Sequence, residues 1–277
     1  MWWPFACGAP ISNDVLYEDG VFVAALPDAD RLSAPERLRL AVVGDAMLLA
    51  SAVEAAAASD ERTSLLVAAG AGLANAAPDT RSDTVRSWEA VAVAARLGES
   101  TVTFYARSTV AEPVDGGDLD WTLDIAPSPD GPWTPFASGT HDPDGSGILS
   151  WDLGAQNEAL QIVGEAEAVD GAYVSLAPRQ VDLVTTALSG ATNRVQMSGP
   201  DALTWSDAWV VTSDDTPWPG TATATASSLG LGGSATGVVV TDTNDVSFTT
   251  CWDAAGNTVW LSGGAEVLAV GDPADCS

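Results

Sequence analysis

The chain has 277 residues and a formal net charge of −28, from 38 acidic and 10 basic residues, and all ten basic residues are arginine. So negative a field repels phosphate backbones and anionic lipid surfaces, which argues against nucleic acid as a partner. Hydrophobic residues make up 46% of the chain, so we expect a folded protein rather than a disordered one.

The first residues form a short apolar stretch that reaches a cysteine. The sequence FACG around Cys7 matches the end of a bacterial lipoprotein signal, where a small residue precedes the cysteine that receives the lipid. We therefore predict a signal-peptide remnant at residues 1–6, lipidation of Cys7, and a lipid-anchored acidic tether over residues 7–32. Six residues are few for a signal peptide, which points to a start codon placed late or a truncated precursor, with a chance match as the alternative.

Residues 33–78 are predicted to be helical. Ser33 and Glu36 have the spacing of a capping box, in which each side chain binds the other residue's backbone N–H. We expect the first helix to end before Ser59 or Asp60, where a second helix begins. That second helix must end before Pro78.

The most apolar helical stretch is residues 40–58. It contains Asp45 and Glu54 and is mostly alanine, whereas a membrane span needs about 20 strongly apolar residues. We therefore expect it to pack on a sheet rather than cross a membrane.

From residue 79 onward, β-branched and aromatic residues alternate with polar ones between turn residues, as in antiparallel strands. The expected strands are residues 87–97, 100–108, 120–127, 133–140, 147–153, 163–169, 171–177, 179–188, 193–198, 203–213, 221–228, 235–242, 246–253 and 257–263. One short helix is expected after Asp152, at residues 154–160. The prediction is an α+β, mainly β fold in which the helices pack on a curved antiparallel sheet. We expect an open barrel or a sandwich of about ten or more strands, with residues 79–277 as the β domain and 33–277 as one structural domain.

Two of the three cysteines lie near the C-terminal end of the sequence. A disulfide between Cys251 and Cys276 closes a loop of about 25 residues and contributes about 3 kcal/mol on the loop-entropy account. Two unpaired buried thiols are the alternative. The spacing of cysteine and histidine does not match a zinc site.

The sequence gives little support to catalysis. His141 is the only histidine, so a Ser-His-Asp mechanism has to use it, yet no G-x-S-x-G elbow presents a serine. Because it stands in an acidic turn, we expect His141 to be solvated. Asp142 and Asp144 in the same turn form a weak Ca²⁺ candidate, but the rest of a calcium loop is missing, and a plain hairpin turn is the favoured interpretation.

Several tryptophans stand beside carboxylates, which is the most sugar-like neighbourhood in the chain. Possible ligand-stacking residues are Trp121, Trp133 and Trp151, and the neighbouring acids are Asp120, Asp124 and Asp152. Packing of these rings within the fold is the favoured alternative, and no pair of acids stands out as a glycosidase pair.

Three stretches carry a resemblance to a known group of proteins: Pro78 to Trp88, the Cys-Trp-Asp that starts at Cys251, and the Gly-Asp-Pro-Ala-Asp-Cys that ends at Cys276. With the lipobox cysteine and the acidic lead, they resemble uncharacterised lipoproteins of myxobacteria and related deltaproteobacteria. The resemblance implies two helices followed by a long antiparallel sheet, and an anchored location. It implies no activity.

The resulting hypothesis is a non-catalytic, lipid-anchored cell-envelope protein. We expect export to the outer membrane, facing the periplasm or the surface, a membrane contact through lipid on Cys7, a monomer, and no cofactor. One alternative is a carrier that holds an acyl chain or other amphiphile in a half-open barrel. Another is a glycan-binding or glycan-acting module.

Overall fold

The structure is a computed structural model that describes most of the chain. The described residues are 19–33, 47–97, 99–113, 117–142, 147–161, 172–177, 180–186, 192–198, 202–208, 220–227, 233–241, 245–263 and 270–275.

Strands dominate the described part of the chain. They are β1 Thr80–Arg81, β2 Val85–Leu97, β3 Ser100–Ala111, β4 Leu119–Ala126, β5 Thr134–His141, β6 Gly147–Trp151, β7 Ala172–Ala177, β8 Gln180–Thr186, β9 Thr192–Ser198, β10 Ala202–Ala208, β11 Gly220–Ser227, β12 Gly233–Thr241, β13 Asp245–Trp252, β14 Thr258–Gly263 and β15 Val270–Gly271. The helices are α2 Ala29–Leu32, α4 Met47–Asn75, α5 Leu153–Leu160 and the 3₁₀ turn η1 Pro273–Asp275.

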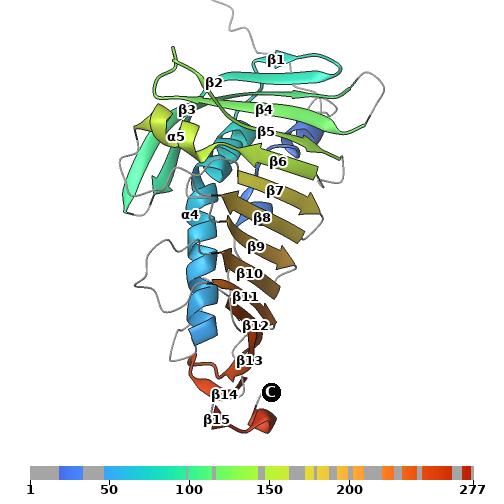
Figure 1. Cartoon of the computed structure of the whole chain (residues 1–277). Helices are drawn as coiled ribbons and strands as arrows, with labels where there is room; N and C mark the ends of the chain where they lie inside the picture. The colour runs from blue at the N-terminus through green and yellow to red at the C-terminus, as the bar shows by residue number, and fades with distance from the viewer. Residues whose placement is uncertain are drawn as a thin grey trace, which may run out of the picture.

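The strands lie in one sheet, in which each strand from β1 to β15 pairs antiparallel with the next strand along the chain. Figure 1 shows this meander as a stack that runs the length of the molecule. The predicted class, mainly β with helices and antiparallel strands, is confirmed. The short helix expected after Asp152 is also present as α5. The expected strand at 163–169 lies outside the described residues.

Helix α4 runs along the sheet and contacts strands β2, β3 and β9 to β12 (Figure 1). At 1.5 Å per residue its 29 residues extend about 43 Å. The predicted break at Ser59 or Asp60 is wrong, because α4 passes through both positions without interruption. Alanine dominates the sequence around them, and its helix propensity outweighs the capping tendency of two polar residues. No helix of the described part is long and apolar enough to span a membrane.

Residues 19–32 belong to the folded body, so the tether predicted over residues 7–32 is wrong for this part. Residues 19–23 form a helical turn and α2 follows after a short loop. Phe22, Leu26 and Leu32 are each 4% exposed or less and lie in the main hydrophobic core. Burying each of these side chains stabilises the fold by about 2 kcal/mol. The apolar residues therefore dock this segment on the fold, although the acidic residues between them are typical of a tether.

Among the residues whose burial the structure describes, the largest buried side chains gather under strands β2 to β6. Side chains alternate between buried and exposed along β3 and β4, as expected for strands with one face covered. The large buried side chains here are Trp88, Phe104, Trp121, Leu123, Phe136, Leu149 and Trp151. The chain's own side chains therefore fill the inner face of this part of the sheet.

A glycine in α4 allows the N-terminal segment to approach closely. A Cβ at Gly70 would lie 1.8 Å from the backbone oxygen of Pro27. In an isolated helix, Gly→Ala stabilises by about 1 kcal/mol. Here we expect Gly70→Ala to lower the free energy of unfolding by about 2 kcal/mol, because the backbone of residue 27 must move away from the helix. Chemical denaturation followed by circular dichroism measures this change.

Gly20→Ala is the matched control. Gly20 also lies in a helical turn, but nothing lies within 4 Å of a Cβ placed there. This variant should be neutral or slightly stabilising. If Gly70→Ala were as harmless as Gly20→Ala, the packing of residues 19–32 on α4 would be incorrect.

Candidate functional site

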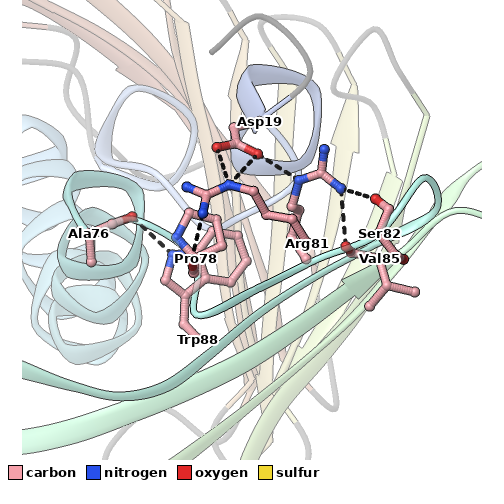
Figure 2. A network of polar contacts seen from close by, with 8 residues as sticks. Asp19, Ala76, Pro78, Arg81, Ser82, Val85 and Trp88 are labelled. Carbon is pink, nitrogen blue, oxygen red and sulfur yellow. Dashed lines mark hydrogen bonds and ion pairs between the residues drawn. The ribbon is translucent and has the colours of Figure 1, made fainter. Parts of the chain in front are cut away.

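The most developed polar site in the described part of the chain joins the N-terminal segment to the sheet. The carboxylate of Asp19 lies between two guanidinium groups (Figure 2). Arg86 donates from Nε to Oδ1 of Asp19 at 2.6 Å, and Arg81 donates from Nε to Oδ2 at 3.0 Å. We call Asp19, Arg81 and Arg86 the N-terminal clamp.

Further bonds hold both arginines in place. Arg86 donates from Nη1 to the carbonyl oxygens of Ser82 and Val85, and its guanidinium lies 4.4 Å from the ring centroid of Phe22. Arg81 donates from Nη1 to the carbonyl oxygen of Pro78 at 3.0 Å. The clamp therefore fixes the loop between β1 and β2 as well as the first helical turn.

The charges of the clamp are unevenly exposed. The side chain of Arg86 is 3% exposed, whereas that of Arg81 is 36% exposed and that of Asp19 is 12% exposed. Burial raises the pKa of Asp19, but hydrogen bonds and charge from Arg86 and Arg81 outweigh burial, so its pKa is below the usual value. Asp19 is therefore ionised at neutral pH and paired on both sides.

The C-terminal end of α4 is bonded beside the clamp. The indole Nε1 of Trp88 donates to the carbonyl oxygen of Ala76 at 3.0 Å, as Figure 2 shows. Carbonyl groups at helix ends lack partners within the helix. The bond from Trp88 gives the carbonyl of Ala76 a partner. It also orients the Trp88 ring, which is 1% exposed.

His141 takes part in a buried pair, and the prediction that it is solvated is wrong. It lies at the end of β5, is 1% exposed, and its Nδ1 accepts a hydrogen bond from Trp121 Nε1 at 2.8 Å. The cause is register, since β4 and β5 pair so that Leu119 faces His141 and Trp121 faces Gly139. A Cβ at Gly139 would lie 2.7 Å from the indole of Trp121, so only glycine leaves room for that ring.

The predicted stacking tryptophans fall into two groups. Trp121 is 2% exposed and Trp151 is 3% exposed, so neither ring offers a face to a dissolved ligand. Trp133 is only partly buried and lies next to the ion pair between Arg107 and Asp124. The stacking hypothesis therefore narrows to Trp133.

Two of the acids beside these tryptophans have structural partners. Asp152 caps the N-terminus of α5, because its side chain accepts a bond from the backbone N–H of Ala155. Oδ1 of Asp120 accepts a hydrogen bond from the hydroxyl of Thr140 at 3.0 Å. Both carboxylates therefore have local structural roles, as a helix cap and as a cross-strand hydrogen-bond acceptor.

The remaining predicted residues are only partly described. Asp142 is exposed, Asp144 lies outside the described residues, and the described part of the chain contains no group of three or more metal-ligating side chains. Cys251 is 2% exposed on β13, while Cys7 and Cys276 lie outside the described residues. The lipidation of Cys7 and the disulfide between Cys251 and Cys276 stay predictions.

Sequence reasoning missed the N-terminal clamp, although one signal for it was present. Arg86 precedes the buried Trp88 by two residues, so strand alternation places both on the same face of β2. A buried arginine requires an acidic partner. The sequence alone does not say which of 38 acids that partner is.

Comparison with protein families, with curated proteins and with solved structures finds no match for this chain.

Proposed function

We propose that this chain is a non-catalytic cell-envelope protein, anchored to the outer membrane through a lipid on Cys7. The observation that carries the proposal is the N-terminal clamp, which ties the first described residue of the folded body to β1 and β2. A protein held by its N-terminus needs a firm attachment at the place where the anchor segment meets the fold.

The position of Asp19 in the folded body sets an upper limit on the length of the proposed anchor segment. Residues 7–18 separate the lipidation site from Asp19, and such a segment reaches at most about 40 Å when extended. The proposed tether is therefore less than half as long as the one expected from composition alone. The folded body would lie close to the membrane, facing the periplasm or the exterior, as a monomer without a cofactor.

A disulfide between Cys251 and Cys276 belongs to the same proposal. Cys251 pairs with Trp260 of β14, and Trp260 pairs with Gly271 of β15, so residue 271 lies two strand spacings, about 10 Å, from Cys251. The turn η1 follows directly and contacts β14. This arrangement supports a bridge that joins the last strands of the sheet. For the sheet as a whole, we propose an open barrel rather than a sandwich.

The lipid anchor is tested by replacing Cys7. When the protein is expressed behind a lipoprotein signal sequence in a Gram-negative host, we expect Cys7→Ser to move it from the membrane fraction to the soluble fraction. Mass spectrometry of the mature protein should find the lipid on Cys7 and a peptide that links Cys251 to Cys276.

Ser12→Ala is the matched control, because it alters the same proposed segment without touching the thiol. It should stay in the membrane fraction. Unchanged fractionation of Cys7→Ser would overturn the anchor, and two free thiols at Cys251 and Cys276 would overturn the bridge.

The alternatives are supported unequally. A carrier needs an apolar cavity of several hundred Å³, whereas the inner face of strands β2 to β6 is filled by side chains such as Trp121 and Phe136. The glycan-binding alternative is supported by one specific site, the outer face of the sheet around Trp133.

A further inference from the structure

Three side chains gather on the outer face of the sheet, away from the core. Arg107 of β3 and Asp124 of β4 are register partners, and Trp133 directly precedes β5. The side chains of Arg107 and Asp124 are 40% and 23% exposed. We call these three residues the Trp133 platform.

Two direct contacts join the members of the platform. Arg107 donates from Nε to Oδ2 of Asp124 at 2.7 Å, and its Nη2 lies 2.7 Å from the same oxygen in the ion pair. Its guanidinium lies 4.8 Å from the ring centroid of Trp133. Within the described part of the chain, the Oδ1 of Asp124, the Nη1 of Arg107 and the Nε1 of Trp133 have no protein hydrogen-bond partner.

A tight loop holds Trp133 in position. Gly131 has a φ of +89°, a backbone conformation that favours glycine, and a Cβ there would lie 3.1 Å from Cδ1 of Trp133. Ser128 accepts a backbone bond from Gly131 and donates from Oγ to its carbonyl oxygen at 2.7 Å. The backbone just before Trp133 is therefore held, and the Arg107 guanidinium contacts the ring, which lowers the entropy cost of binding.

Folding stability gives little reason for this arrangement. An exposed ion pair contributes about 0–1 kcal/mol, and an exposed cation–π contact contributes about as much. A carboxylate oxygen that accepts, two N–H groups that donate, and an aromatic ring at one exposed place are the groups that recognise a polyhydroxylated ring.

We propose that the Trp133 platform binds a neutral saccharide. The sugar ring would lie against Trp133, with hydroxyl groups donating to Asp124 Oδ1 and accepting from Arg107 Nη1. The net charge of −28 disfavours anionic sugars, because the only cation of the platform is already paired with Asp124. This inference does not depend on the lipid anchor, so either proposal can fail without the other.

The surface beside the platform suits a sugar chain rather than a single ring. Thr109, Thr122 and Ser138 are exposed and face one another across β3, β4 and β5, one pleat from the register pair Arg107 and Asp124. Their hydroxyl groups extend the polar surface across three strands. We therefore expect longer oligosaccharides to bind more tightly than disaccharides.

The test is a calorimetric titration of the full chain with cellohexaose, maltohexaose and hexa-N-acetylchitohexaose as neutral probes. We expect at least one to bind, with Trp133→Ala abolishing binding and Asp124→Asn weakening it at least tenfold. Thr101→Ala is the control, because Thr101 is exposed on the same face of β3 but three pleats from Arg107. It should bind as the unaltered chain does.

Thermal unfolding checks that each variant is folded, and tetragalacturonate is the anionic comparison. The neutral probes are tested up to about 10 mM, on the order of the weakest Kd that would still count as specific binding. If none of them binds at that concentration, the proposal is overturned. Unchanged binding by folded Trp133→Ala, or tighter binding of tetragalacturonate than of the neutral probes, would overturn it too.

Discussion

Replacing Arg86 with methionine is expected to lower the free energy of unfolding by about 3–5 kcal/mol, the range for breaking one side of a buried ion pair. The loss removes the 2.6 Å bond to Asp19, the contact with Phe22, and the donors to the carbonyls of Ser82 and Val85. Asp19 would then keep only the half-exposed Arg81. Denaturant unfolding measured at pH 7 gives the size of the effect.

Arg81→Met is the matched control within the N-terminal clamp. The side chain of Arg81 is 36% exposed, against 3% for Arg86. Water can therefore solvate Asp19 in place of the Arg81 guanidinium. We expect a cost of about 1 kcal/mol. Equal costs for the two variants would show that burial does not determine the strength of the clamp.

The same clamp predicts an acid dependence that is carried by Asp19. Because its pKa in the folded protein is below the ordinary value of 3.8, the ionised carboxylate stabilises the fold at pH values above that value. The contribution declines as the pH falls below 3.8 through the folded-state pKa. Asp19→Asn should therefore be less stable than the unaltered chain at pH 7, and this difference should shrink at pH 3. A difference of the same size at both pH values would contradict the assignment.

The strands were predictable from the sequence because strand alternation is a local property. Residues 100–108 and 193–198 are expected as strands and lie within β3 and β9. The alternation that predicts each strand lies entirely within that strand's own residues. The break expected at Ser59 failed for a related reason. A capping residue signals a helix end only when its neighbours do not favour a helix, and alanine favours one.

The N-terminal segment could not be predicted in this way. Its packing depends on Arg86, 67 residues away, and on a glycine at position 70 that gives room to the backbone of Pro27. Neither partner is visible from the composition of residues 19–32, which is acidic and resembles a tether. The position of His141 depended likewise on a pairing register that brings it to Trp121. Contacts between distant segments thus determine both sites, and local patterns do not encode them.

The pair of Trp121 and His141 gives the second large expected effect. Trp121→Ala should lower the free energy of unfolding by about 4 kcal/mol, because it leaves a large cavity in the core that β4 and β5 cover. Trp121→Phe fills most of that space but removes the Nε1 donor. Since Nδ1 of the buried His141 then loses the bond from Trp121, we expect this variant to cost about 2 kcal/mol.

A double-mutant cycle separates the hydrogen bond from the packing. In a His141→Leu background the acceptor is absent, so Trp121→Phe should cost clearly less there than in the unaltered chain. The coupling energy between positions 121 and 141 should be about 1 kcal/mol or more, measured by denaturant unfolding of the four proteins. Purely additive costs would mean that the 2.8 Å bond contributes nothing to stability and that Trp121 acts through its volume alone.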